Sequence, residues 1–237
     1  MNTLILEHDQ FLDANQALLQ PRQYEHIKQV LKLNCGDEVR VGKINDNLGS
    51  GHFYEKDSRG FVRNIRLDIP PPSTLPLTLI VAMPRPQMLK RILQTVACFG
   101  VEKLILIQTR RVEKSFWQSP SAQDGAIREQ FVLGLEQANA TQLPELKMYH
   151  RFKSFIEDDC PGLTAKTDKW LLHPGPYPFL PCGSQLVPST LAIGPEGGFT
   201  DYECERWFEQ GFKAAQLGER ILRVETAVTS ALARLAG

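Results

Sequence analysis

Residues 77–83, Leu-Thr-Leu-Ile-Val-Ala-Met, form a nearly continuous apolar run, which is typical of a β-strand buried on both faces. Residues 87–99 follow with apolar side chains at helical spacing, and residues 103–108 form a second apolar run. A strand, a helix and a strand in this order predict a parallel sheet that is covered by helices.

The chain after residue 108 continues this alternation. We expect helices over residues 121–139, 152–158, 201–210 and 224–235, and strands over residues 146–149, 170–173, 190–193 and 213–217. The second part of the chain is therefore predicted to be an α/β domain.

The chain before residue 70 has a different pattern. Polar and apolar residues alternate over residues 37–42 and 61–67, Gly49-Ser50-Gly51 is a predicted turn, and residues 24–33 carry one helical stripe. Short strands with a single helix predict a small β-barrel.

Pro70-Pro71-Pro72-Ser73 separates the two patterns. Each proline removes a backbone donor and favours extended geometry in the residue before it, so a proline run is a natural linker. We therefore expect two domains, residues 1–72 and residues 73–237.

The composition limits the classes of function. The 237 residues carry 27 basic and 27 acidic side chains, which excludes a wholly basic nucleic-acid binder but not a local basic patch. The five cysteines are widely spaced and form no C-x-x-C pair, so we expect neither disulfides nor a metal site. No apolar run approaches the roughly 20 residues that span a bilayer, and residues 1–12 lack the features of a signal peptide. A cytoplasmic protein without a membrane segment is the expectation.

The common cofactor and nucleophile motifs are absent from the sequence. It contains no G-x-x-x-x-G-K-[ST], no G-x-G-x-x-G after a strand, no H-E-x-x-H and no G-x-S-x-G. The usual ATPase, dinucleotide-binding, zinc-protease and α/β-hydrolase classes are therefore not indicated.

Two loops late in the chain stand out instead. Residues 193–200, IGPEGGFT, follow an apolar strand and precede a helix, and glycines in this place let the backbone approach a ligand closely. A plain strand–helix turn explains this loop equally well. Residues 217–227, LGERILRVETA, are placed in the same way, and we expect Ile221 and Leu222 to be buried against something, because an exposed loop gains nothing from them.

Together the two loops resemble the paired signatures of the SPOUT RNA methyltransferases, in particular of the RsmE family, which methylates N3 of a uridine in 16S ribosomal RNA. His26-Ile27-x-x-Val30-Leu31-x-x-x-x-Gly36-Asp37 resembles the N-terminal signature of that family. The resemblance covers nearly the whole chain. It implies a SPOUT-type parallel sheet with a C-terminal trefoil knot, preceded by a PUA-like β-barrel that binds RNA.

The resemblance also implies S-adenosylmethionine as the cofactor. Carried over to this sequence, the pocket would consist of residues that follow three strands: Leu172, His173, Gly194, Pro195, Glu196, Gly197, Gly198, Leu217, Gly218, Ile221 and Leu222. Family members dimerise, so a homodimer is expected. The face of residues 224–235 formed by Val228, Ala231, Leu232 and Leu235 is a candidate interface, with ordinary core packing as the alternative.

Methyl transfer to uracil N3 needs an aligned acceptor and help with the N3 proton. Arg223 is the candidate for contacting the uracil oxygens or the developing negative charge, and Glu225 and Thr226 are candidates for positioning the base. An ion pair of Arg223 with Glu196 or Glu225 is the alternative.

Basic residues cluster in one part of the chain. Residues 84–115 contain seven basic and two acidic side chains and are followed by Phe116 and Trp117, a composition suited to phosphates and unpaired bases. A solvated face, with Trp117 in the core, is the alternative. The candidate RNA-binding residues are Lys32, Arg85, Lys90, Arg91, Arg110, Arg111 and Lys114.

The implied partner is 16S ribosomal RNA or the small ribosomal subunit. Two alternatives are a SPOUT enzyme that methylates another RNA position and a non-catalytic RNA-binding assembly factor. The intact residues 194–198 and Arg223 favour an active enzyme.

Overall fold

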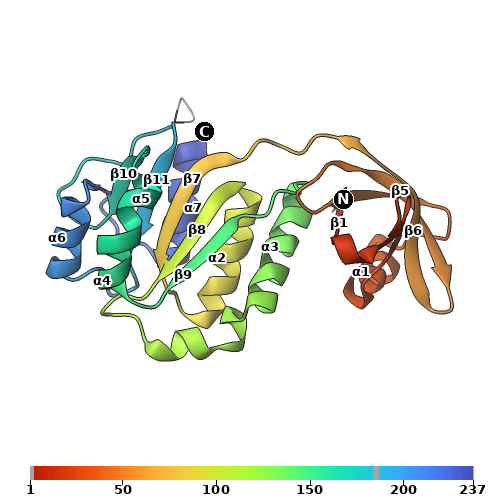
Figure 1. Ribbon diagram of the computed structural model, residues 1–237, viewed down its shortest axis with the longest axis horizontal. Helices are drawn as coiled ribbons and strands as arrows, with labels where there is room; N and C mark the ends of the chain where they lie inside the picture. The colour runs from red at the N-terminus through yellow and green to blue at the C-terminus, as the bar shows by residue number, and fades with distance from the viewer. Residues whose placement is uncertain (1–2, 184–186, 237) are drawn as a thin grey trace. The chain divides into compact units, whose positions relative to one another are not determined.

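The computed structural model describes residues 3–183 and 187–236 (Figure 1). The chain forms two compact units: unit 1 contains residues up to Ser73 together with residues 132–143, and unit 2 contains the remainder. The predicted division at residue 72 did not include residues 132–143, where the chain returns to unit 1. Hydrogen bonds fix the returning segment there, for example from the Thr3 hydroxyl to Asn139 Oδ1 at 2.7 Å.

Unit 2 is built on a six-stranded sheet in which every pair is parallel. The strands are, in sheet order, β12 (Lys213–Ala215), β10 (Asp168–Leu172), β11 (Ser189–Ile193), β7 (Leu75–Ala82), β8 (Val101–Ile107) and β9 (Glu145–Tyr149). Residues 79–82 and 104–107 are fully buried, as their continuous apolar sequence predicts for strands covered on both faces. The predicted α/β parallel sheet is confirmed.

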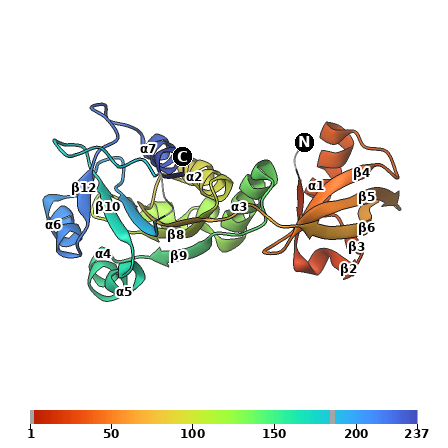
Figure 2. The same cartoon turned by 90° about the horizontal axis from the view of Figure 1, so that it is seen from above.

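Helices cover both faces of this sheet (Figure 2). On one side lie α2 (Pro86–Cys98), α7 (Val224–Ala236) and the start of α3 (Asp124–Ala138), and on the other lie α4 (Phe152–Ser154), α5 (Cys160–Thr164) and α6 (Asp201–Glu209). A π-helical turn at Phe155–Asp159 joins α4 to α5, so the helix predicted over 152–158 runs further than expected. Pro161 does not end it and lies in the first turn of α5, directly after the π-helical turn.

The face of α7 that was expected to contribute to a subunit interface lies in the core of the protomer instead. Val228, Ala231 and Leu232 have no exposed surface, and α7 packs against α2 and β11. The alternative of ordinary core packing is correct for these three residues. Leu235, at the end of the helix, is half-buried.

Unit 1 is a curled sheet of mixed direction, in the order β1 (Leu4–Leu6), β4 (Glu38–Lys43), β5 (Leu48–Lys56), β6 (Arg59–Ile69), β3 (Gln16–Leu18) and β2 (Phe11–Asp13). The β1–β4 pair is parallel and the other pairs are antiparallel. The expected helix at 24–33 is α1 (Pro21–His26) followed by a π-helical turn at Ile27–Leu31. Phe53 of β5 and Ile27 of the π-helical turn are fully buried in the apolar core of unit 1.

The turn predicted at Gly49-Ser50-Gly51 is wrong, because these residues lie inside strand β5. The pairing of β5 with β6 shifts register on both sides of Ser50, and the β6 backbone approaches Gly49 closely. A Cβ atom on Gly49 would lie 1.7 Å from the carbonyl oxygen of Arg66. Glycine is needed here for close strand approach and not for a turn.

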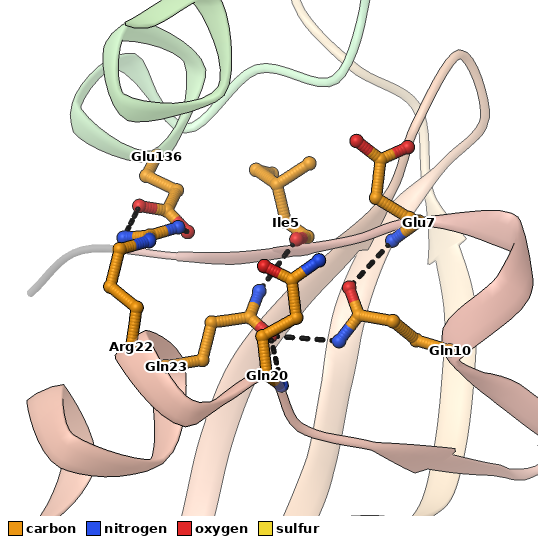
Figure 3. A network of polar contacts seen from close by, with 7 residues as sticks. All are labelled: Ile5, Glu7, Gln10, Gln20, Arg22, Gln23 and Glu136. Carbon is orange, nitrogen blue, oxygen red and sulfur yellow. Dashed lines mark hydrogen bonds and ion pairs between the residues drawn. The ribbon is translucent and has the colours of Figure 1, made fainter. Parts of the chain in front are cut away.

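A network of glutamines fills the polar part of the unit 1 interior (Figure 3). The Gln23 amide donates to the Ile5 carbonyl at 2.8 Å and accepts from Gln10 Nε2 at 2.8 Å. Beside it, the Arg22 guanidinium forms two hydrogen bonds of 2.9 Å with the Glu136 carboxylate. This paired contact attaches the end of α3 to unit 1, since a bidentate arginine–carboxylate pair is both directional and strong.

Substitution of Gly49 by alanine should destabilise unit 1. The new methyl group would overlap backbone atoms of β6, which cannot rotate away, so we expect a loss of at least about 3 kcal/mol. Gly125→Ala is the control, because its Cβ meets nothing within 4 Å in helix α3, and there we expect a gain of about 0.5–1 kcal/mol. Urea unfolding followed by circular dichroism measures both, and equal unfolding midpoints for the two variants would contradict the close-approach argument.

Candidate functional site

Three strands of unit 2 end at the same edge of the sheet. β10 ends at Leu172, β11 at Ile193 and β12 at Ala215, and because all three are parallel their following loops meet there. A cavity of about 450 Å³ lies between these loops and the start of α7. Its size is in the range of small-molecule and cofactor sites, which are about 300–1,000 Å³.

The predicted pocket residues come together at this cavity, with one exception. Ten of the eleven line it: Leu172, His173, Gly194, Pro195, Glu196, Gly198, Leu217, Gly218, Ile221 and Leu222. Gly197 is outside the lining, and its Cβ position lies 3.1 Å from Arg111 Cδ.

The lining also contains residues that sequence analysis missed: Pro174, Gly175, Pro176, Ile193, Phe199, Ala215, Gln216, Glu219, Arg220, Val224 and Ala227. Most of them are neighbours of the predicted residues in the sequence, and this proximity could have indicated that they line the cavity. Ala227 differs, because it reaches the cavity only through the turn of helix α7.

The rim of the cavity is apolar and exposed. Ile221 is 83% exposed and Leu222 is 37% exposed in the single chain, so the expected burial of this loop stays a prediction that needs a bound molecule or a second chain. No segment within residues 3–183 and 187–236 covers Ile221. An exposed apolar side chain at the mouth of a cavity is suited to contact with a bound molecule or a second chain.

The glycine loop at residues 194–200 is anchored at its end by an aromatic cluster. Phe199 is 3% exposed, and its ring centroid lies 5.8 Å from that of the fully buried Trp207 on α6. Just before it, Gly198 has a φ angle of 72°, a conformation that favours glycine, and its N–H donates to the Pro195 carbonyl at 2.8 Å. The loop is therefore a closed turn with a fixed end.

The carboxylate of Glu203 ties this loop to the segment after β8. Glu203 is 3% exposed and accepts hydrogen bonds from the Thr200 N–H at 2.8 Å and from the Arg110 N–H at 2.7 Å. Thr200 and Glu203 form a capping box at the start of α6. The T-x-x-E spacing was visible in the sequence, but the partner on Arg110, 93 residues away, was not.

Arg111 contacts the same loop through its side chain. Its guanidinium donates to the carbonyl of Gly197 and, at 3.4 Å, to that of Phe199. Arg110 differs, since only its backbone is bonded to Glu203 and its side chain is exposed. Of the two neighbouring candidates for RNA binding, Arg111 is thus already engaged by the cavity loop.

His173 lines the cavity beside Cys204, with 4.0 Å between Nδ1 and Sγ. Burial lowers the pKa of His173, with Arg111 acting in the same direction and Asp201 opposing it. Burial raises the pKa of the Cys204 thiol, and Asp201 and Glu203 add to this. Both shifts favour the uncharged form of these two side chains.

The predicted catalytic residues lie next to the cavity but not in its lining. Arg223 and Thr226 are exposed and Glu225 is half-buried, at the start of α7. The ion pair that Glu196 forms is with Arg85, at 3.7 Å between Nε and Oε1. Within the described residues, Arg223 forms no ion pair, which leaves its charge available at the rim of the cavity.

The remaining basic candidates are dispersed. Lys90 and Arg91 are exposed on α2, Lys114 is exposed in the segment between β8 and α3, and Lys32 is exposed in unit 1. Trp117 is half-buried, donates from Nε1 to Gln108 Oε1 at 2.6 Å and packs against His150 at 4.2 Å between ring centroids. Its ring is therefore already occupied by protein contacts.

The described residues contain no group of three His, Cys, Asp or Glu side chains placed to bind a metal ion. Over the same ranges, no helix is both long enough and apolar enough to cross a membrane.

The parallel sheet and the cavity at its carboxyl edge define an α/β protein with a cofactor-type site. Residues 71–236 match the model of the RNA methyltransferase domain family, and the chain belongs to that family. The family resemblance found in the sequence is thereby confirmed.

Individual relatives agree with this assignment. The chain is 29% identical to the ribosomal RNA small subunit methyltransferase E of Treponema pallidum, over 98% of this chain and 90% of the relative. It is 25% identical to the ribosomal RNA small subunit methyltransferase E 1 of Borreliella burgdorferi, over 98% and 95%. The structure of the ribosomal RNA small subunit methyltransferase E from Neisseria gonorrhoeae, bound to S-adenosyl methionine, has the same fold, with a TM-score of 0.76, 19% identity and coverage of 98% and 95%.

Arg111→Ala should loosen the glycine loop. Loss of its hydrogen bonds to two carbonyls should speed hydrogen exchange of the Gly198 amide about five- to tenfold, which corresponds to about 1 kcal/mol. Arg110→Ala is the matched control, since it leaves the backbone bond to Glu203 in place. Mass-spectrometric exchange measures both, and equal exchange in the two variants would show that Arg111 does not stabilise the loop.

Proposed function

We propose that this protein transfers a methyl group from S-adenosylmethionine to N3 of a uridine in 16S ribosomal RNA. The observation that carries the proposal is the convergence of ten predicted residues, from three separate loops, on one cavity in a member of an RNA methyltransferase family. The names of the relatives and the S-adenosyl methionine bound to the Neisseria protein support it.

The cavity fits this cofactor chemically. Leu172, Ile193 and Val224 provide buried apolar walls that suit the faces of an adenine ring, while the glycine loop brings backbone polar groups close. The neutral imidazole of His173 avoids repulsion with a sulfonium cation. When bound, S-adenosylmethionine supplies an electrophilic methyl group.

The chain's own residues orient the acceptor. In this proposal Arg223, which is unpaired and adjacent to Leu222, contacts the uracil oxygens and stabilises the negative charge that develops as N3 loses its proton. Glu225 and Thr226 position the base from the first turn of α7. The pocket assignment extends to Gly197, which acts through Arg111 and the shape of its loop.

We propose that the connections around the cavity form a trefoil knot. Strand β10 lies between β11 and β12 although it precedes both. The loop after β10 pairs with the segment after β12, with Gln216 donating to Pro178 at 2.9 Å and accepting from Leu180 at 2.9 Å. Further along, the Gly183 N–H donates to the Arg234 carbonyl at 3.0 Å, which attaches the same loop to α7. These hydrogen bonds hold the loop after β10 against two segments that follow it in the chain, and this contact is the support for the proposed knot.

Unit 1 corresponds in this proposal to a PUA-like barrel that contributes to RNA binding, and unit 2 carries the methyltransferase site. The candidates for phosphate contacts are Lys32 in unit 1 and Arg85, Lys90, Arg91, Arg110, Arg111 and Lys114 in unit 2, although Arg85 is also ion-paired with Glu196 and Arg111 is also bonded to the glycine loop. The site of action is the small ribosomal subunit or its RNA in the cytoplasm. A SPOUT enzyme for another RNA position and a non-catalytic assembly factor are the competing functions.

We also propose a homodimer in which the exposed rim at Ile221 and Leu222 is covered by the second chain. The support is the apolar character of this rim, since two large aliphatic side chains at one exposed place favour burial. The mass of the protein in solution, measured by light scattering at micromolar concentration, tests the proposal.

Ala227→Leu should block the cavity. The larger side chain projects from α7 into the lining while leucine keeps the helix stable, so the affinity for S-adenosylmethionine should fall at least about tenfold, or about 1.4 kcal/mol. Ala233→Leu makes the same change at an exposed position of the same helix and should bind normally. Calorimetry measures both, and unaltered binding by Ala227→Leu would mean that the cofactor site lies elsewhere.

Arg223→Ala should reduce single-turnover methylation of unmodified 16S ribosomal RNA about a hundredfold or more, as expected when a donor to developing charge is lost. Cofactor affinity should stay unchanged, and Arg223→Lys should recover part of the rate because it restores the charge. Mapping of the methylated nucleotide by mass spectrometry identifies the position. A wild-type rate in Arg223→Ala would remove this residue from the catalytic role.

A further inference from the structure

The register of unit 1 brings three arginines to one face of its sheet. Strands β4, β5 and β6 lie side by side (Figure 2), and Ser50 of β5 pairs with Arg40 on one side and with Arg66 on the other. Two residues further along β5, His52 pairs with Arg63. Since paired residues of antiparallel strands share a face, Arg40, Arg63 and Arg66 point the same way.

An irregularity in β6 produces this arrangement. Arg63 and Arg66 are three residues apart and would lie on opposite faces of a regular strand. Asn64 has a φ angle of 53°, and the register shifts between Ser50 and His52, as in a β-bulge. The extra residue turns Ile65 into the core, where it is 4% exposed, and leaves both arginines outside.

This face carries cationic and aromatic side chains, which suit a ligand that has both negative charges and planar rings. Within the described residues, the three arginines form no ion pair with a carboxylate, although Glu38 lies opposite His52 on the same face. The Arg63 guanidinium carbon lies 5.1 Å from the centroid of the Tyr54 ring, and Tyr54 pairs with Phe61. Lys56 and Arg59, paired at the hairpin end, add two further cations.

We propose that the outward face of β4, β5 and β6, centred on Arg40, Arg63 and Arg66, is a binding surface for the sugar–phosphate backbone of ribosomal RNA. The proposal rests on the proposed function and deepens it, because the residues that line the cavity all lie in unit 2. The guanidinium group of arginine binds a phosphate through two parallel hydrogen bonds, and guanidinium groups and tyrosine rings stack on unpaired bases. This combination favours RNA over an acidic protein surface.

The test is the salt dependence of RNA binding by the full-length protein. Binding to transcribed 16S ribosomal RNA is measured for the wild type and for the double variant Arg63→Gln with Arg66→Gln. The slope of log K against log salt should become less steep in the variant, by about 1.4 if the two lost phosphate contacts are to single-stranded RNA and by about 1.8 if they are to a duplex. At saturating RNA the methylation rate should be unchanged while KM rises, because lost phosphate contacts weaken ground state and transition state equally.

Lys166→Gln with Lys213→Gln is the matched control. It removes two charges at exposed positions near the amino ends of β10 and β12, at the opposite edge of the sheet from the cavity, and should leave the slope unchanged. An unaltered slope in the arginine variant, or an equal loss in the control, would overturn the RNA surface. If the arginine variant differs from the wild type by the predicted slope but the wild type transfers no methyl group to the RNA, the surface stands and the proposed function fails.

Discussion

The buried carboxylate of Glu203 is the contact on which the arrangement of the site depends. One oxygen accepts from the Arg110 N–H and the other from the N–H and hydroxyl of Thr200, so one side chain joins the segment after β8 to the end of the glycine loop. A carboxylate with 3% exposure needs such partners, since an unpaired buried charge is strongly unfavourable. The same group begins helix α6 and thereby sets where Trp207 packs against Phe199.

The cavity follows from parallel strands and restrained loops. The loop after β10 is attached to Gln216, and the loop after β11 is attached to Glu203 and Arg111. The loop after β12 leaves Ile221 exposed at the rim. Two restrained loops and one exposed loop suit a cavity that holds a small cofactor and stays accessible to a macromolecule. Unit 1 carries a separate sheet face on which Arg40, Arg63 and Arg66 lie.

Periodicity predicted unit 2 well and unit 1 in part: the strands over 37–42 and 61–67 and the helix over 24–33 are present, whereas the turn over 49–51 is not. Strands covered on both faces are apolar throughout, so residues 77–83 and 103–108 were recognisable from composition alone. In unit 1 the three-residue strand β1 is too short to show an alternation, and Gly49 suggested a turn. The glycine is there because the Arg66 backbone approaches it, which is a contact between strands and leaves no local signal. The pocket residues were predictable because they are contiguous with two loops, whereas Ala227 needed the geometry of α7.

The sequence by itself determined the alternation of strands and helices, the two late loops and the family, because each depends on residues within a few positions of one another. Only the tertiary structure decided which residues of those loops face the cavity, that Arg111 is engaged by carbonyls 86 and 88 residues away, and that Arg63 and Arg66 share a face. These outcomes depend on packing between distant segments and on a single bulge at Asn64. Local propensity carries no information about either, since the free energy of such contacts exists only once the strands are assembled.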